Sequence, residues 1–339
     1  MQRIEEIYWL RAYGCLAVFF FHLLDHLERH VDTWALNLAR IPTVLGTPIF
    51  IFISIFLFSA RYGCAIPKGF LGNRIKYVMM PYLVYGLAYS IAEFLRLYSL
   101  DEDNGLWATM KEYMVFAGWH GYFLIIAAQF YLIYWLYCRF DMARYLAATP
   151  CLVLGSLISM GWWGYWQWNS HLPPGYLHWV APLGWLYLFF LALVLVQYYN
   201  DTASPRPQWV DYLAKSYWLI ATTGLIILLS LPGWLEYSSK EIWVVPLFLI
   251  FTVWMMKHLK GRQAPPLIKR LNEVSFGIYL THPMFFNLVD VFNAGERLST
   301  TLYILTLTGI GLAGSIGWNM LVNRWRWGGL LFGKRMQIK

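Results

Sequence analysis

The chain has 339 residues, of which 59% are hydrophobic and 19% aromatic, whereas only 13% are charged. Soluble domains carry about 25% charged residues, so this composition excludes an ordinary soluble enzyme, a disordered scaffold and a collagen-like chain. The formal net charge is +8, but the basic residues lie between apolar runs. The charge therefore indicates membrane topology, and no nucleic-acid partner is expected.

Apolar runs of roughly 20 residues, the length that crosses a bilayer, recur along the whole chain. They predict an all-α polytopic membrane bundle of about ten transmembrane helices, built as a single membrane-embedded domain, 1–339. The expected spans are 6–25, 41–60, 75–95, 119–138, 146–165, 179–198, 212–232, 241–257, 274–293 and 302–322. No signal-peptide cleavage pattern follows the first run, so it is expected to remain as a span.

The basic residues also predict an orientation. Most of the 26 Lys and Arg residues fall on one side of the expected spans, and cytoplasmic loops are the ones that keep them. Both termini are therefore expected in the cytoplasm, and the protein is expected in the plasma membrane as a multi-pass protein.

Four cysteines lie in expected spans or on the expected cytoplasmic side, where disulfides do not persist. We expect them to be buried thiols, with an acylated-cysteine relay as the alternative. They are Cys15, Cys64, Cys138 and Cys151.

The first expected span contains two ionisable side chains, Arg11 and His22, eleven positions apart. Eleven helical residues complete about three turns plus about 20°, so both side chains face the same way, about 16 Å apart along the axis. Ionisable groups inside lipid are costly and therefore indicate function. Asp25, three residues after His22, shares this face and could orient the imidazole.

This geometry suits a long anionic donor that enters from the cytoplasm, such as acyl-coenzyme A. Its phosphates would bind the Arg11 guanidinium, and its thioester would meet a hydroxyl group that His22 deprotonates. Three alternatives stay open: an interfacial Arg11, a His22 satisfied by a neighbouring helix, and a metal site formed by His22, His26 and His30.

The Arg11-x10-His22 spacing resembles the signature of the acyltransferase-3 family of integral membrane proteins, and within it the intercellular adhesin C subgroup of poly-N-acetylglucosamine operons. The resemblance runs the length of the chain. The other similar stretches are 8–12, 46–50, 74–82, 89–93, 118–123, 129–130, 275–283 and 333–334.

This resemblance implies transfer of an acyl group, usually from acyl-coenzyme A, to extracytoplasmic sugars. It implies His22 as the catalytic base and Arg11 as a residue that binds the coenzyme or holds the pocket together. Asp25 and His26 are not matched, so the role of Asp25 rests on geometry alone. The subgroup has been described both as polysaccharide exporters and as O-succinyltransferases, and the resemblance carries both descriptions.

Further candidates follow from their position in the expected spans. Arg74 and Lys76, at the cytoplasmic start of the third span, are expected to contact coenzyme phosphates or to snorkel to the interface. Glu93, near the outer end of that span, is a candidate catalytic acid that could orient His22 or an acceptor hydroxyl, or could cap a helix interface.

The candidate substrate-binding residues lie in the fourth and ninth spans. Pro283 is expected to open the ninth helix locally, and broken helices at that depth line cavities. The candidates are His120, Tyr122, Gln129, Tyr279 and His282.

The sequence therefore predicts an integral membrane O-acyltransferase that moves acetyl or succinyl from acyl-coenzyme A to hydroxyls of a cell-surface polysaccharide. No permanently bound cofactor and no metal are expected, because a thioester is already activated. A polysaccharide synthase complex is a candidate partner. Two alternatives remain: a polysaccharide export protein without acyl-transfer chemistry, and a non-catalytic membrane partner of a synthase.

Overall fold

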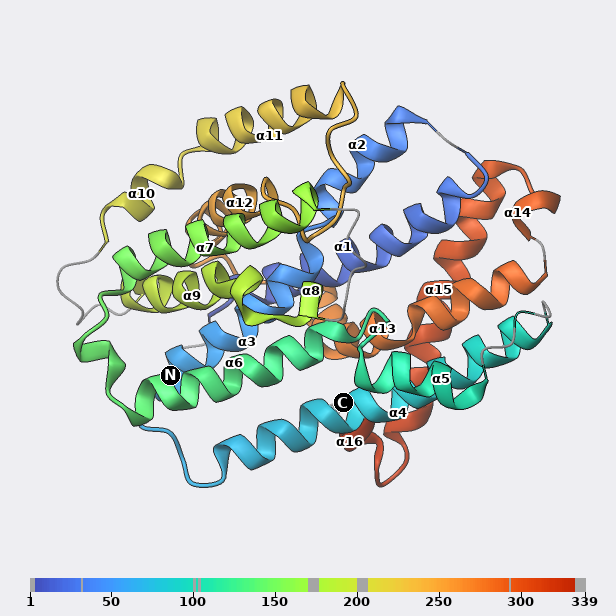
Figure 1. Ribbon diagram of the computed structural model, residues 1–339, viewed down its shortest axis with the longest axis horizontal. Coiled ribbons are helices and arrows are strands. Elements are labelled where there is room, and N and C mark those ends of the chain that lie inside the picture. Colours follow the sequence, from blue (N-terminus) through green and yellow to red (C-terminus); the bar gives the residue numbers. More distant parts are fainter. Residues whose placement is uncertain are drawn as a thin grey trace. The chain divides into compact units, whose positions relative to one another are not determined.

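The computed structural model describes residues 4–31, 33–99, 102, 105–169, 177–199, 207–292 and 294–332. These residues form helices and connecting turns with no strand among them (Figure 1), which confirms the all-α prediction. Six helical segments are long and apolar enough to cross a bilayer, as expected of a multi-pass membrane protein. They are α1 (Glu6–Glu28), α2–α3 (Trp34–Tyr62), α4 (Phe70–Ser99), α6 (Tyr122–Arg139), the segment His178–Tyr199 and α15 (Thr300–Asn323).

The other four expected spans coincide with helices that are shorter or less apolar. These are α7 (Ala148–Trp168), α11 (Ser216–Ser230), α12 (Val244–His258) and α13 (Pro266–Val291). A count of ten spans and the cytoplasmic placement of both termini therefore stay predictions. The segment His178–Tyr199 contains α9 (Leu186–Tyr199) and most of α8 (Leu177–Val180), and the other short α-helices are α5 (Leu106–Met110), α10 (Trp209–Leu213), α14 (Ala294–Arg297) and α16 (Gly328–Leu331).

The helices group into two compact units. Unit 1 comprises Met1–Pro67, Ile133–Leu172 and Pro182–Ser275, and unit 2 comprises Lys68–Leu132, Pro173–Ala181 and Phe276–Lys339. Helices α6 and α13 each contribute residues to both units.

In unit 1, α1 packs against α2 (Trp34–Thr43), α3 (Gly46–Tyr62) and α12, while α9 packs against α3 and α7. Two glycines bring α1 and α3 together. A Cβ atom on Gly14 would lie 2.8 Å from Ile49 Cγ2, and one on Gly46 would lie 2.5 Å from Val18 Cγ2. Small residues permit such close approach between membrane helices, so this contact fixes α1 against the unit's centre.

Two carboxylates anchor the start of α1. Glu6 Oε1 accepts from the Gly261 backbone N–H at 3.1 Å, and Glu5 Oε2 accepts from the Ala264 N–H at 2.9 Å. Lys269 Nζ also lies 3.3 Å from Glu5 Oε2. The basic connection that follows α12 is therefore folded onto the helix that carries Arg11 and His22.

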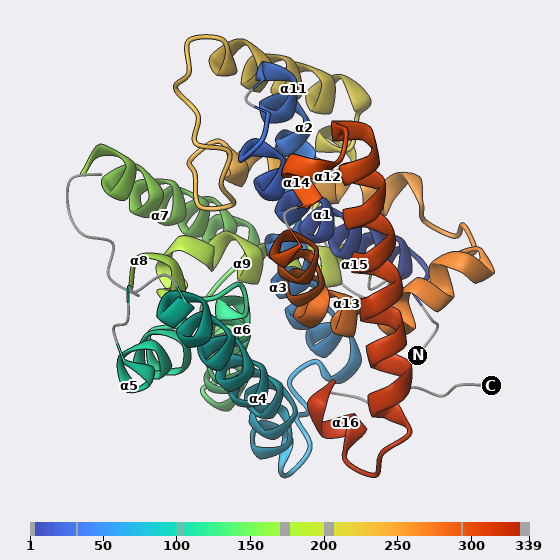
Figure 2. The same ribbon diagram turned by 90° about the vertical axis from the view of Figure 1, so that its right-hand side faces the viewer.

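In unit 2, α4 packs against α5, against the π-helical turn Lys111–Val115, and against α16 (Figure 2).

The prediction that Pro283 opens the ninth helix is wrong, since α13 continues through it. The Tyr89 hydroxyl donates to the Leu280 carbonyl oxygen at 2.9 Å. This carbonyl is next to that of Tyr279, which Pro283 deprives of its helical donor, so Tyr89 supports the helix where the proline weakens it.

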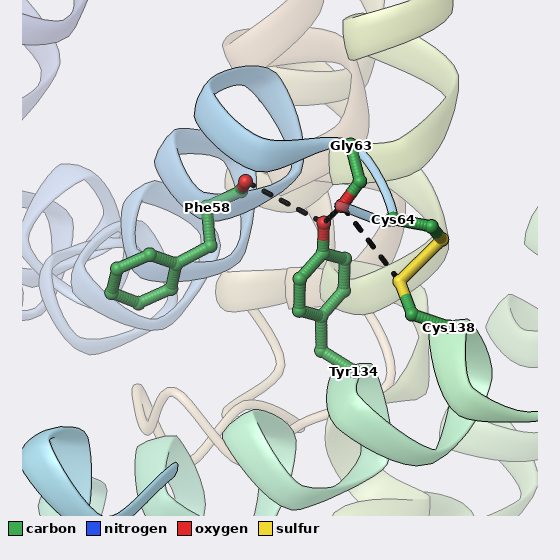
Figure 3. Close-up of a disulfide and its surroundings, with 5 residues drawn as sticks. All are labelled: Phe58, Gly63, Cys64, Tyr134 and Cys138. Atoms are coloured by element: carbon green, nitrogen blue, oxygen red, sulfur yellow. Dashed lines mark hydrogen bonds between the residues drawn. A yellow bond between two sulfur atoms is a disulfide. The ribbon is translucent and has the colours of Figure 1, made fainter. Parts of the chain in front are cut away.

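The expectation that all four cysteines remain thiols is wrong for two of them, because a disulfide joins Cys64 and Cys138 (Figure 3). The turn after α3 lies beside the last turn of α6, and the two Cα atoms are 5.0 Å apart, within the usual range for a disulfide. The Tyr134 hydroxyl donates to the Gly63 carbonyl oxygen at the same place. Sequence separation hid this proximity.

Candidate functional site

Arg11 and His22 lie on one unbroken helix, because α1 runs from Glu6 to Glu28 without interruption. Their eleven-residue spacing therefore keeps the register that the sequence predicts, with both side chains on the same face. Both residues are half-buried.

Asp25 lies beside His22, as its i,i+3 spacing predicts. Its Oδ2 is 3.4 Å from His22 Nδ1, and the two side chains are 35% and 26% exposed. Hydrogen bonds of catalytic histidines are often long without substrate and shorten when it binds. When a carboxylate accepts from Nδ1–H, the lone pair remains on Nε2, and that nitrogen can take a proton from a substrate hydroxyl.

Arg40 is a site residue that the sequence analysis missed. It belongs to α2, and its side chain is only 9% exposed. Its Nη2 donates to Asp25 Oδ1 at 2.8 Å and to Glu28 Oε2 at 2.8 Å, and its Nη1 donates to Glu28 Oε1 at 3.3 Å. Two carboxylates three residues apart on one helix, beyond an apolar run, are the sequence signal that could have indicated a buried cation.

The predicted coenzyme-binding cations of the third span lie at the start of α4 in unit 2. Arg74 is half-buried with its guanidinium carbon 5.8 Å from the centre of the Phe70 ring, and Lys76 is exposed. Glu93, later on α4, pairs with Arg96: Nε donates to Oε2 at 2.9 Å and Nη2 to Oε1 at 2.8 Å. Glu93 is thus paired with Arg96 in the structure.

Three of the predicted substrate-binding residues meet in unit 2. The ring centres of His120 and His282 are 5.8 Å apart, and the Tyr279 hydroxyl donates to the His120 carbonyl oxygen at 2.6 Å. Tyr89 and Trp119 add rings at 4.9 Å and 5.0 Å from the His120 ring. We call these five residues the aromatic–histidine cluster.

The cluster is apolar and well buried at its centre. His282 has no exposed surface, and its Nδ1 lies 2.7 Å from the Ile278 carbonyl oxygen. Tyr122 and Gln129, the other predicted substrate residues, lie on α6 and are half-buried. Among the described residues, Gln129 Oε1 is buried without a hydrogen-bond partner.

Glu241 is a buried carboxylate that the sequence analysis did not single out. It lies between α11 and α12 and has no exposed surface. It accepts from the Ser238 and Glu236 backbone N–H groups at 2.8 and 3.1 Å, from Trp243 Nε1 at 2.7 Å and from Gln167 Nε2 at 3.2 Å. Burial raises the pKa of this carboxyl, and the hydrogen bonds from Ser238, Glu236 and Trp243 oppose the rise only in part. Glu241 therefore holds the backbone of the connection between α11 and α12 in place.

The candidate residues thus fall into two sets. Unit 1 holds Arg11, His22 and Asp25 together with Arg40, whereas unit 2 holds Arg74, Lys76, Glu93, His120, Tyr122, Gln129, Tyr279 and His282. The first set contains a candidate general base, His22, and a carboxylate that can orient it, Asp25. The second combines cations, aromatic rings and amide or hydroxyl groups.

Comparison with known proteins assigns the chain to a family. The Acyl_transf_3 model, described as an acyltransferase domain, matches residues 4–319, which is nearly the whole chain. No solved structure matches the chain significantly.

Individual relatives match over almost their full lengths. The chain is 27% identical to the "Putative membrane-bound acyltransferase YfiQ" of Bacillus subtilis, over 99% of this chain and 96% of that protein. It is 23% identical to the "Probable poly-beta-1,6-N-acetyl-D-glucosamine export protein" of Staphylococcus aureus, over 91% of each chain. The protein of the same name from Staphylococcus epidermidis is 25% identical, over 90% of this chain and 88% of that one.

Proposed function

Because this chain belongs to the acyltransferase-3 family and is a membrane acyltransferase, we propose that it transfers an acetyl or succinyl group from acyl-coenzyme A to a polysaccharide hydroxyl at the plasma membrane. The observation that carries this proposal is the pairing of His22 with Asp25 on α1, at 3.4 Å. It supplies the group the reaction needs most, a candidate general base whose ring a carboxylate orients.

In the proposed reaction His22 Nε2 takes the proton of an acceptor hydroxyl as its oxygen attacks the thioester carbonyl carbon. The tetrahedral intermediate then expels the coenzyme A sulfur, which receives the proton from the imidazolium. Asp25 orients the ring and balances its positive charge. General-base catalysis of this kind contributes about 10²–10⁴-fold in rate.

The donor is proposed to bind through its phosphates. Guanidinium groups bind phosphate in a bidentate manner, and Arg11 lies about 16 Å from His22 along the axis of α1. Arg74 and Lys76, at the start of α4 in unit 2, stay predicted contacts of the coenzyme phosphates.

The acceptor is proposed to bind at the aromatic–histidine cluster. Aromatic rings present apolar faces on which sugar rings stack, while hydroxyl and amide groups fix their orientation. Tyr122 and Gln129 are proposed to assist, and Glu93 to act on an acceptor hydroxyl. The names of the staphylococcal relatives make a poly-N-acetylglucosamine chain the first acceptor to test.

The same names support a second candidate, a polysaccharide export protein without acyl transfer. An exporter needs an aqueous path, whereas a carboxylate-held histidine serves proton transfer. The geometry around His22 therefore favours the enzyme over the conduit and over a non-catalytic partner of a synthase.

The test uses the purified full-length protein in detergent with acetyl-coenzyme A or succinyl-coenzyme A and a β-1,6-linked N-acetylglucosamine oligosaccharide. Release of free thiol is followed beside His22→Ala, Arg11→Ala and the control His30→Ala, which changes an exposed histidine beyond the end of α1. We expect acceptor-dependent release with one donor, its loss in His22→Ala and a raised KM for the donor in Arg11→Ala. Release that His22→Ala leaves unchanged would refute the assignment of the base.

A further inference from the structure

Arg40 occupies a position that stability alone does not explain. Its guanidinium is buried between two carboxylates, Asp25 and Glu28, that are themselves 35% and 49% exposed. Removing a guanidinium from water carries a desolvation cost that ion pairing often only offsets, so a buried ion pair is weak evidence for a stabilising role. A role in positioning a neighbouring carboxylate explains a buried cation here better than a role in stability does.

We propose that Arg40 is a positioning residue for the transfer reaction, which holds Asp25 so that its second oxygen faces His22. This inference rests on the proposed function and adds a residue of α2 to it. Arg40 does not touch the reacting atoms; it acts through Asp25.

The two carboxylate oxygens of Asp25 have different partners. Oδ1 accepts from Arg40 Nη2 at 2.8 Å, while Oδ2 lies 3.4 Å from His22 Nδ1. A half-exposed aspartate can rotate about its side-chain bonds, and a charge-assisted hydrogen bond to one oxygen restricts that rotation. Glu28 accepts from Nη1 at 3.3 Å and from the same Nη2 that bonds Asp25 at 2.8 Å. These two hydrogen bonds hold the guanidinium in place beside Asp25.

The charges also suit a histidine that accepts a proton. Asp25, Glu28 and Arg40 together carry one net negative charge, so the group becomes neutral when His22 turns into an imidazolium. Without Arg40 the carboxylates of Asp25 and Glu28 would lose the cation that bridges them, and their mutual repulsion would disperse them. With Arg40 present, the three groups carry a net charge of one negative unit, which stays at a fixed position.

A merely structural role for Arg40 predicts different behaviour, and the chain offers a matched control. A second tie joins α1 and α2, in which the Tyr13 hydroxyl donates to the Pro42 carbonyl oxygen at 2.8 Å. Tyr13→Phe removes this tie and leaves Asp25 untouched. Arg29, exposed at the end of α1, gives Arg29→Met as a control for loss of a cation.

The experiment measures kcat and KM of thiol release from acetyl-coenzyme A or succinyl-coenzyme A, with thermal unfolding of each full-length variant. Arg40→Met and Asp25→Asn are each expected to lower kcat by about 10- to 100-fold, a part of the general-base contribution. KM for the donor and acceptor should stay within about threefold. Tyr13→Phe and Arg29→Met should leave kcat within about threefold of the parent protein.

The double variant decides whether Arg40 acts through Asp25. Residues that work as one unit are non-additive, so Arg40→Met/Asp25→Asn should be no slower than the slower single variant. Arg40→Lys keeps the charge but loses the fork, and is expected to recover part of the kcat. If Arg40→Met does not fold, the same cycle is measured with Arg40→Lys, whose coupling to Asp25→Asn must then be non-additive.

The proposal is overturned if Arg40→Met, or Arg40→Lys in its place, keeps the parent kcat. It is also overturned if its effect multiplies with that of Asp25→Asn, or if Tyr13→Phe lowers kcat as much. Failure of the proposed function looks different: the parent protein releases no thiol, or His22→Ala releases it as fast as the parent.

Discussion

Histidines in the two units of this protein have contrasting surroundings. His22 of unit 1 lies beside Asp25, in a group that Arg40 and Glu28 complete with charge. His282 of unit 2 is fully buried, has its Nδ1 at a backbone carbonyl, and faces the rings of His120 and Phe286 at 5.8 and 5.5 Å.

The role of a histidine therefore depends on its surroundings more than on its place in an apolar helix. A carboxylate partner and partial exposure suit a histidine that acts on a substrate, whereas aromatic rings and complete burial hold an imidazole in one place. Both residues lie in apolar helices and would be equal candidates for a base by sequence position alone. We expect substitution of His22 to lower turnover and substitution of His282 to lower stability.

The largest expected effect is on turnover. His22→Ala should lower kcat by about 10²–10⁴-fold while the unfolding temperature stays within a few degrees, since the side chain is 26% exposed. Turnover and thermal unfolding are measured on the same detergent preparation, with His30→Ala as control. A His22→Ala protein that turns over normally would erase the contrast between the two histidines.

The reciprocal variant, His282→Ala, is expected to act on stability. Removing a side chain with no exposed surface leaves a cavity, which costs about 2–4 kcal/mol of the free energy of unfolding. Thermal unfolding should show a clear drop, and the folded fraction should keep a measurable kcat. A stable His282→Ala protein without turnover would instead place His282 at the reacting atoms.

Glu241 extends the contrast from histidines to carboxylates, because unlike Asp25 it is buried and saturated with donors. Glu241→Gln should destabilise the protein by about 1–3 kcal/mol, since an amide nitrogen would face N–H donors. The raised pKa also means that the folded state keeps this proton to higher pH than the unfolded chain does. The parent should therefore lose stability as pH rises from the unfolded to the folded pKa of Glu241. Unfolding followed against pH should show this loss in the parent and not in Glu241→Gln.

A smaller effect is expected within the aromatic–histidine cluster. Tyr279→Phe removes the 2.6 Å hydrogen bond to the His120 carbonyl oxygen and keeps the ring, which should cost about 1 kcal/mol of stability. KM for the oligosaccharide should rise while kcat is little changed. A fall in kcat alone, with KM unchanged, would argue against acceptor binding at this cluster.

The smallest effect is expected at an exposed ion pair in unit 1, where Lys257 pairs with Asp211. Lys257 lowers the pKa of the Asp211 carboxyl, so its contribution to stability is present above the unfolded pKa and is lost as pH falls through the folded pKa. Exposed pairs contribute about 0–1 kcal/mol. Asp211→Asn should thus change unfolding only slightly at neutral pH. A large loss there would show that the cytoplasmic end expected for α12 depends on this pair.

Much of the helical framework could be predicted from the sequence, because apolar runs of membrane length carry a strong signal. The spacing of Arg11, His22 and Asp25 also predicted their shared face, since all three lie on one helix. Arg40 escaped prediction because its partners come from another helix. The pairing of Cys64 with Cys138 escaped because expected compartment, rather than proximity, guided the interpretation. In α13, the helix continues through Pro283, and Tyr89 of α4 donates to the Leu280 carbonyl oxygen, a contact that no local pattern indicates.

The most direct test of the account is the ester content of the surface polysaccharide made by cells that carry either the parent protein or His22→Ala as their sole copy. Ester-linked acetyl and succinyl groups are quantified by mass spectrometry, together with the total amount of exported polymer. We expect His22→Ala cells to export an unchanged amount of polymer that has lost its acyl esters. Polymer that disappears from the surface, or esters that persist, would refute acyl transfer by His22.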